Sequence, residues 1–244
     1  MKFQEIKPHS HLAPFIDAYW EITCSEEAPS VLKVMPDGCI DIMINLGAEF
    51  RAEYANLTLR NGKGYLGGAI KYFQEAITSQ ETHLAGIRFK PAAFSHFYNF
   101  SSLHETTDHI LELAADLIPE PGSVLKNARA AFDAFFHKKL RLPGRSLLPV
   151  IQTVRECRGN ISVCKLAEQH CTTVKQLQRS FQYHVGLSPK EFTNIVRYRS
   201  AQQLIQARHP VKKLSEIAFE CGYADQAHLS REIRKYTGLT PTAL

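Results

Sequence analysis

A pattern that occurs twice in residues 166–241 constrains the fold of this 244-residue chain more than any other feature. Segments 166–189 and 217–241 each start with an aliphatic residue followed by Ala and close with Gly-Leu-[Ser/Thr]-Pro. The residues that align at a constant spacing are Leu177, Arg179, Phe181, Gly186, Leu187 and Pro189 in the first copy and Leu229, Arg231, Ile233, Gly238, Leu239 and Pro241 in the second. An internal repeat predicts two copies of one supersecondary unit.

Each copy is predicted to fold as a short helix, a turn and a longer second helix. In the first copy Ser162 caps the short helix, and Thr172 or Thr173 caps the second helix, which ends before Gly186. In the second copy Asp225 takes the same capping place. A unit of this kind lays its second helix in the major groove of DNA.

The outward face of each longer helix is predicted to be cationic. At about 100° per residue, the apolar side chains gather on one side of the helix and the basic and amide side chains on the other. Arg179 and Arg231 occupy equivalent outward positions, and Arg is suited to bidentate recognition of guanine. The predicted DNA-binding residues are Lys175, Gln178, Arg179, Gln182, His228, Ser230, Arg231 and Arg234.

Solvated surface charge is the competing explanation for these basic residues. Outward Arg and Lys on a single helix are more often an ordinary surface than a DNA contact. Two equivalent helices in one chain favour DNA. The Leu, Ile, Phe and Val positions of both copies are interpreted as core, without a role in recognition.

A connecting helix is predicted between the two copies, over residues 189–208. A helix of about 17 residues spans roughly 25 Å, so with its turns it can hold two recognition helices about 34 Å, or one DNA turn, apart. One chain would then read two successive major grooves. The predicted phosphate contacts are Thr173, Lys190, Arg197, Arg199 and Gln226, with surface charge an equal explanation for the two arginines.

Residues 161–241 resemble the paired helix-turn-helix domain of AraC/XylS-type transcription regulators. The resemblance rests on Leu-x-Arg-x-Phe at 177–181, Gly-x-Ser-Pro at 186–189 and Gly-Tyr-x-Asp-Gln at 222–226. Leu229 and Ile233 depart from the Phe pair usual in the family, and the sequence ends three residues after Pro241, where the family usually continues. The resemblance implies a sequence-specific DNA-binding transcription regulator, with helix-turn-helix units at about 161–189 and 213–241.

Charge divides the chain into two predicted domains. Residues 143–244 have a net charge of +8 and residues 1–142 a net charge of −3, within a total of +5. A basic segment is the expected footprint of a module that binds a polyanion. We therefore expect a β-rich sensor or dimerisation domain at 1–142 and a DNA-binding domain at 143–244, which starts with a helix at about 146–158.

The first domain is predicted to contain strands followed by helices. Strands are expected at 18–23, 31–34, 39–46, 64–66, 73–78 and 84–89, and helices at 91–98, 107–117 and 123–140. In segment 39–46, Ile40, Ile42 and Ile44 share a face that suits a core. The other face is mixed and could line a cavity. The helix at 123–140 is apolar enough to cover the sheet, and its remaining surface is either a subunit interface or ordinary surface.

Several segments of this domain, including 11–20, 35–47 and 86–91, resemble the N-terminal domain of an uncharacterised subgroup of the same regulators. In the wider family such domains are small cupin-like β-barrels that bind an effector or mediate dimerisation. The expected fold is therefore α+β, with an N-terminal β-barrel-like domain carrying helices and an all-α C-terminal domain of two helix-turn-helix motifs joined by a linker helix. Candidate effector-binding residues are Asp37, Asp41, Arg88 and Lys90.

Catalysis and metal binding are not expected. His9-Ser10-His11 has the spacing of a cupin metal site but lacks the following Glu, so no metal, cofactor or catalytic residue is predicted. The alternative function is a cupin-like small-molecule-binding or metal-dependent enzyme domain fused to a non-regulatory DNA-binding module. Six Cys without a Cys-x-x-Cys pair suggest neither zinc nor a disulfide framework.

The expected partners follow from this assignment. They are double-stranded promoter or operator DNA and a small-molecule effector of unknown identity, with RNA polymerase and a second copy of the chain as further candidates. The sequence has neither a signal-peptide pattern nor an apolar run of about 18 residues, so we expect a cytoplasmic protein without a membrane partner.

Overall fold

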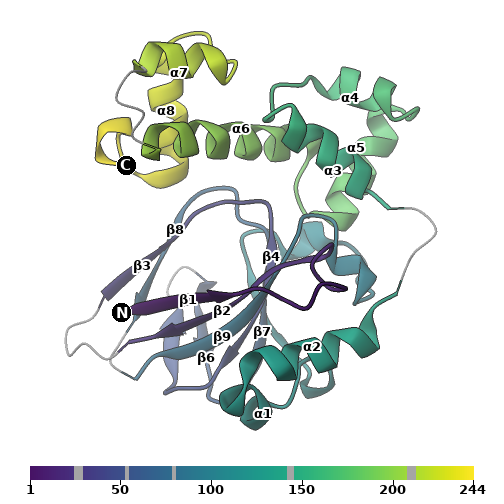
Figure 1. The fold of residues 1–244 in the computed structure, drawn as a ribbon, viewed down its shortest axis with the longest axis vertical. Helices are drawn as coiled ribbons and strands as arrows, with labels where there is room; N and C mark the ends of the chain where they lie inside the picture. The colour runs from purple at the N-terminus through teal and green to yellow at the C-terminus, as the bar shows by residue number, and fades with distance from the viewer. Residues whose placement is uncertain (25–29, 53–54, 79–80, 142–145, 208–212) are drawn as a thin grey trace.

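The computed structural model describes all residues except 25–29, 53–54, 79–80, 142–145 and 208–212. The expected domain boundary between residues 142 and 143 lies outside the described residues. Figure 1 shows a β-rich N-terminal part next to a helical C-terminal part. This arrangement confirms the predicted α+β fold class.

Six strands of the N-terminal part form one antiparallel sheet in the order β1-β2-β9-β4-β7-β10. Their bounds are β1 Lys2–Ile6, β2 Ile16–Thr23, β4 Ile40–Asn45, β7 Gly64–Gly67, β9 His83–Phe89 and β10 Ile110–Leu113. Two ribbons accompany the sheet, namely β3 (Ser30–Val34) with β8 (Gln74–Thr78) and β5 (Phe50–Ala52) with β6 (Leu57–Leu59). Since the sheet ends on β1 and β10, the described residues form an open sheet with two ribbons and no closed barrel.

The central strand β4 separates the core from a cavity, as its alternation predicts. Ile40, Ile42 and Ile44 are buried in the hydrophobic core. Asp41 and Met43 point to the opposite face and line the cavity. This strand therefore gives one wall of the cavity a mixed polar and apolar surface.

Helix α2 (Ala128–Lys139) covers the core face of the sheet through aromatic contacts. The Phe132 ring lies 5.0 Å from that of Tyr19, and the Phe136 ring lies 5.4 Å from that of Phe89. The single helix expected at 123–140 is instead two helices, because Asn127 has an extended backbone (φ −160°, ψ 94°) between α1 (Pro121–Lys126) and α2. The Asn127 side chain accepts a hydrogen bond from Ala130 N and so caps α2.

Two predicted helices of the N-terminal part are wrong. The segment expected to be a helix at 91–98 contains only the 3₁₀ turn η2 (Phe94–His96), because Ala92 has a positive φ of 66° that a helix does not allow. The segment 107–117 contains strand β10 and the 3₁₀ turn η4 (Ala115–Leu117), because its backbone pairs with β7. Strands β1, β5 and β6 were also not predicted.

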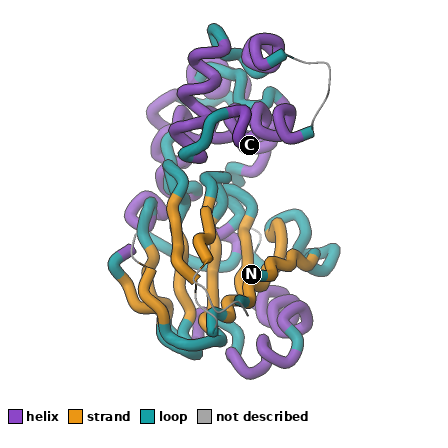
Figure 2. Tube along the Cα trace, turned by 90° about the vertical axis from the view of Figure 1, so that its left-hand side faces the viewer, coloured by secondary structure: helices purple, strands orange, loops and turns teal. Residues whose placement is uncertain are grey.

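The C-terminal part consists of helices whose bounds agree with the predicted repeat. They are α3 Leu148–Glu156, α4 Val163–Gln169, α5 Val174–His184, α6 Pro189–Gln206, α7 Leu214–Glu220 and α8 Gln226–Thr237, followed by the 3₁₀ turn η5 (Pro241–Ala243). Figure 2 shows these helices gathered at one end of the strands. Both helix-turn-helix motifs and the linker helix are thus confirmed.

Candidate nucleic-acid interface

The first recognition helix, α5, is fixed by a capping box and by its apolar face. The Thr173 hydroxyl accepts a hydrogen bond from Gln176 N, and the Gln176 side chain accepts one from Thr173 N. Of the two candidates, Thr172 and Thr173, it is therefore Thr173 that caps α5. Leu177 and Phe181 are buried, so the opposite face of α5 must point to solvent.

The second recognition helix, α8, is held in the same way. The Asp225 carboxylate accepts a hydrogen bond of 2.6 Å from His228 N, and Leu229 and Ile233 are fully buried. The helix ends at Gly238, whose φ of +71° matches the φ of +86° at the equivalent Gly186 after α5. The second helix of each unit therefore has a side-chain N-terminal cap and is followed by a glycine with positive φ.

The outward side chains of α5 and α8 include both predicted guanine readers. Lys175, Gln178 and Arg179 are exposed on α5, and Arg231 and Arg234 are exposed on α8. Within the described residues, neither Arg179 nor Arg231 forms an ion pair. Arg231 Nε donates to the Ala227 carbonyl of its own helix, at 3.4 Å. Both guanidinium groups are therefore accessible from solvent.

Three other predicted DNA-binding residues are less accessible. Gln182 is half-buried, and its backbone carbonyl accepts a hydrogen bond from the Ser102 hydroxyl in the N-terminal part. His228 is half-buried with its ring against Tyr223, and Ser230 donates to the Gln226 carbonyl of its own helix. These three side chains are therefore less open to a base than the exposed side chains of α5 and α8.

The predicted phosphate contacts fall into separate places. Thr173, Lys190 and Gln226 are exposed near the starts of α5, α6 and α8. Arg197 lies over the Tyr223 ring at 5.1 Å and donates to the Asn194 side chain, which suits a packing role. Arg199 lines the cavity of the N-terminal part. The structure therefore does not bring these five residues together.

Helix α6 packs against both recognition helices. Phe192 near its start lies with its ring 5.7 Å from that of Phe181 on α5. Tyr198, in its second half, stacks on Tyr236 of α8 with ring centroids 4.7 Å apart. Since Phe192 and Tyr198 are fully buried, α6 fixes how α5 and α8 sit relative to each other.

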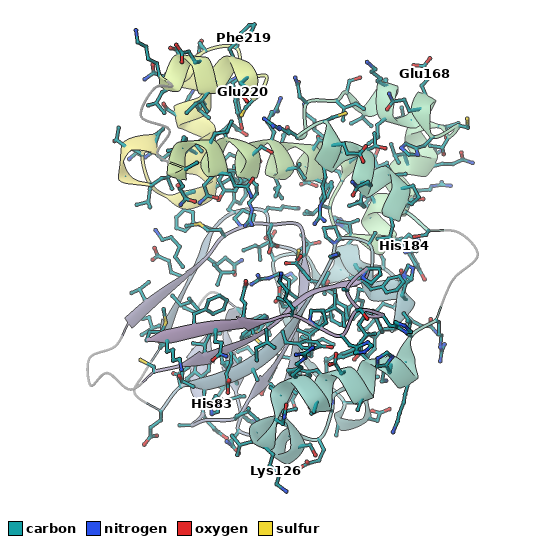
Figure 3. All side chains as sticks on the ribbon, in the orientation of Figure 1. His83, Lys126, Glu168, His184, Phe219 and Glu220 are labelled. Atoms are coloured by element: carbon teal, nitrogen blue, oxygen red, sulfur yellow. The ribbon has the colours of Figure 1, made fainter. Side chains whose placement is uncertain are left out.

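The turn after α5 is hydrogen-bonded to the N-terminal part. The Gly186 carbonyl accepts a bond of 2.7 Å from the Thr107 hydroxyl and one of 3.0 Å from His104 Nδ1. His184, labelled in Figure 3, shares a hydrogen bond of 3.1 Å with Ser95. We call this set of contacts the first dock.

The turn after α8 contacts the N-terminal part at the equivalent repeat position. Lys33 on β3 donates to the Thr237 carbonyl at 3.2 Å, and its ammonium also lies 4.7 Å from the centre of the Phe73 ring. The Phe73 ring in turn contacts Gly238. We call this set the second dock. Both recognition helices are thus anchored at their C-terminal ends.

A cavity of about 420 Å³ is lined by strands and connecting segments of the N-terminal part and by Arg199 of helix α6. Its apolar lining includes Trp20, Ile22, Leu32, Met43, Phe50, Leu59, Leu84 and Ile110, and its polar lining includes Lys33, Asp37, Asp41, Gln74, Arg88, Asp108 and Arg199. This volume is within the usual range of small-molecule sites, about 300–1,000 Å³.

Three of the four candidate effector residues meet in this cavity. Arg88 Nε lies 3.5 Å from an Asp37 oxygen and 3.6 Å from an Asp41 oxygen. Trp20 Nε1 donates to the same Asp41 oxygen at 2.6 Å. Lys90 is elsewhere, because its ammonium donates to the Ala13 carbonyl. Trp20, Gln74 and Lys33 also line this cavity but were not among the candidates. Their only sequence signal is their place in an alternating strand pattern, which does not distinguish a ligand-binding residue from any other strand residue.

The His9-x-His11 motif lies on the surface beside α2. The ring centroid of His137 is 5.2 Å from that of His9 and 6.0 Å from that of His11. In the part of the chain that the structure describes, no three His, Cys, Asp or Glu side chains are arranged to hold a metal ion.

None of the described helices has the length and apolar character that a membrane span requires.

Comparison with known families divides the chain as its fold does. Residues 4–112 match a domain of unknown function, DUF6597, and residues 166–244 match a helix-turn-helix domain family. The chain is similar to the HTH-type transcriptional activators RhaS of Escherichia fergusonii and Salmonella arizonae, each 33% identical over 76 residues. These alignments cover 31% of this chain and only 27% of either relative.

Solved structures extend the likeness to the whole fold. A ligand-free, singly substituted variant of ToxT from Vibrio cholerae aligns over 98% of both chains with 14% identity and a TM-score of 0.51. Wild-type ToxT with a bound unsaturated fatty acid aligns over 91% of this chain and 92% of its own, with 14% identity and a TM-score of 0.50. At this identity the likeness shows the fold alone.

Proposed function

Since residues 166–244 form a helix-turn-helix domain of the AraC type, we propose that this chain is a sequence-specific DNA-binding transcription regulator controlled by a small molecule in its N-terminal cavity. The observation that carries the proposal is the pair of exposed, repeat-equivalent arginines on α5 and α8. Each helix enters one major groove, and α6 sets the spacing between them.

Charge supports DNA as the partner. The C-terminal domain has a net charge of +8, and both recognition helices present basic side chains to solvent. Such a surface releases counterions when it meets the phosphates of DNA, so its affinity should fall as the salt concentration rises.

Lys175→Ala is expected to weaken binding to specific and random duplexes equally and to reduce the salt slope of the affinity by about 1. The reason is that an exposed ammonium on the outer face of α5 neutralises a phosphate without reading a base. Mobility shifts at several salt concentrations measure both effects. Lys126→Ala, an exposed lysine on α1 (Figure 3), is the control and should change neither. A loss confined to one DNA sequence would contradict the phosphate role.

Effector control is proposed from the way the cavity wall reaches both docks. Lys33 lines the cavity and donates to the turn after α8. Asp108 lines it next to Thr107, which donates to the turn after α5. Arg199, a residue of α6, also lines the cavity. A ligand that shifts these residues therefore changes how the two recognition helices are held.

The fatty acid bound to ToxT supports a small-molecule site in a chain of this fold. A second copy of the chain and RNA polymerase are proposed as further partners. For the former, Leu125 on α1 is 60% exposed and is a candidate contact. Sedimentation of the protein with and without a duplex would test the second copy.

Thr107→Val is expected to destabilise the protein by about 1 kcal/mol, because the Gly186 carbonyl loses one of its two donors. Amide hydrogen exchange in residues 182–186 should also speed up, since the first dock is weakened. Thr58→Val, at an exposed position on β6, is the matched control. If exchange in 182–186 is unchanged in folded Thr107→Val protein, this hydrogen bond does not hold α5.

A further inference from the structure

The cavity has a polar end beneath α6 and an apolar end farther from it. Asp37 follows strand β3 by three residues, and Gln74 pairs with Val34 at the end of the same strand. Gly38, next to Asp37, contacts Phe192 of α6. The ribbon β5–β6 contributes apolar residues Phe50, Ala52 and Leu59 to the remaining wall. A ligand would therefore place its polar group under α6 and its apolar body away from it.

The two carboxylates at the polar end, Asp37 and Asp41, share the charge of a single contacting cation within the described residues. Arg88 is the only cation in contact with Asp37 and Asp41 among the described residues, and it is also bound to Glu5 at 2.8 Å. One guanidinium is therefore shared between the two cavity carboxylates and Glu5, an exposed residue of β1. Burial raises the pKa of Asp41 to about 7, and the positive charge of Arg88 only partly opposes this effect. A further positive charge would stabilise the ionised form of Asp41.

Gln74 provides separate evidence that a hydrogen-bond donor is missing from the cavity. Its Oε1 atom is buried and has no hydrogen-bond partner within the described residues. A buried acceptor without a donor costs about 1–3 kcal/mol, so a ligand that supplies a donor gains affinity there. The carboxylate oxygens of Asp37 and Asp41 accept hydrogen bonds as well. All three acceptors line the cavity.

Lys33 and Arg199 are the cavity cations that argue for an anionic ligand. Lys33 is already engaged, because its ammonium lies 3.2 Å from a Glu75 oxygen and donates to the Thr237 carbonyl. Arg199 also has less weight, because of its position. Its side chain comes from α6 at the rim of the cavity, and the residue is half-exposed. Water already solvates its charge there. A carboxylate placed deeper would lie beside Asp37 and Asp41 and be repelled by them.

We propose, on the basis of the effector role proposed above, that this cavity takes a ligand with an apolar body and a cationic, hydrogen-bond-donating amine head. The ammonium group lies beside Asp41 and Gln74, and the apolar body extends along Trp20 and Met43 toward β5–β6. The ligand class therefore differs from the fatty acid in the ToxT structure of similar fold.

Three probes with one skeleton test the charge directly. They are 4-phenylbutylamine, 4-phenylbutanol and 4-phenylbutyrate, titrated calorimetrically into the full chain at pH 7.5. The amine is expected to bind at least about tenfold more tightly than the carboxylate, with the alcohol between them. A carboxylate that binds as well as the amine, or no binding by any of the three, overturns the proposal.

Asp41→Asn locates the effect. The isosteric amide can still accept from Trp20, and the variant is expected to lose about tenfold in amine affinity while alcohol affinity stays within about twofold. Asp116→Asn, at an exposed site on η4, is the control and should leave all affinities unchanged. Unaltered amine affinity in folded Asp41→Asn protein contradicts the proposal. The ratio of amine to carboxylate affinity on the unmodified chain remains decisive if the variant does not fold.

The proposed effector role and the proposed ligand class are rejected by different experimental outcomes. If the amine binds with the expected preference but leaves DNA affinity unchanged, the ligand class stands and control of DNA binding by this cavity is rejected. If DNA binding itself is absent, the calorimetric preference still decides the ligand class.

Discussion

Arg179→Ala and Arg231→Ala are each expected to cost about 1–3 kcal/mol at a cognate DNA site and to relax discrimination at the base pair that the lost arginine reads. Both guanidinium groups are exposed on the outer faces of recognition helices and have no carboxylate partner in the described residues. They therefore approach guanine without first breaking an ion pair. Quantitative mobility shifts against the specific duplex and a random duplex give the loss and its sequence dependence.

Arg155→Ala separates base reading from general charge. Arg155 is exposed near the end of α3, outside both recognition helices. Its loss removes the same charge, so it should leave the ratio of specific to random affinity unchanged. Equal discrimination in all three variants and the unmodified chain would reject α5 and α8 as the base-reading elements.

Phe192→Ala is expected to destabilise the protein by about 3–5 kcal/mol, the usual cost of removing a large buried aromatic side chain. Phe192 is fully buried, packs against Phe181 of α5 and contacts Gly38 of the N-terminal part. Its loss thus leaves a void where the linker helix, the first recognition helix and the wall of the ligand cavity meet. Urea denaturation followed by circular dichroism measures the change in unfolding free energy.

The control for this variant is another Phe→Ala change on the same domain. Phe219 on α7, labelled in Figure 3, is 85% exposed, so Phe219→Ala should change stability by no more than about 0.5 kcal/mol. A loss below about 1 kcal/mol in Phe192→Ala would contradict the view that α6 fixes the recognition helices through this contact.

The C-terminal domain could be predicted closely because its signals are local. Helix periodicity, the caps at Thr173 and Asp225 and the glycines after α5 and α8 each act within one or two turns of chain. The repeat gave independent support for the helices of both helix-turn-helix units. The alternation of β4 is local too, and it identified both the core face and the cavity face correctly.

The failures occur where distant residues decide the structure. Segment 107–117 has an apolar spacing, with Ile110 and Leu113 three residues apart, that suits a helix equally well, and only pairing with β7 makes it a strand. The positive φ of Ala92 has no sequence signal comparable to that of glycine. The first dock joins Thr107 to Gly186, 79 residues along the chain, and periodicity does not report such contacts.

The candidate sites divide in the same way. Arg179 and Arg231 could be selected from helix rotation, because exposure on an amphipathic helix follows from its period. Gln182 was assigned to DNA from the same rotation, and Arg197 and Arg199 were predicted to contact phosphate from the connecting helix. Contacts with the N-terminal part or within the domain determine where these three residues lie. Lys33 and Gln74 could not be found, because their importance arises only when β3 and β8 meet α6 and α8.

Methylation protection of guanine N7 on a selected duplex tests the central claim most directly. The unmodified chain should protect guanines in two successive major grooves on one face of the duplex, about 10 base pairs apart. Arg179→Ala should remove protection in one groove only, and Arg231→Ala in the other only. Protection confined to a single groove, or lost from both grooves alike in each variant, would contradict a chain that reads DNA with two separate recognition helices.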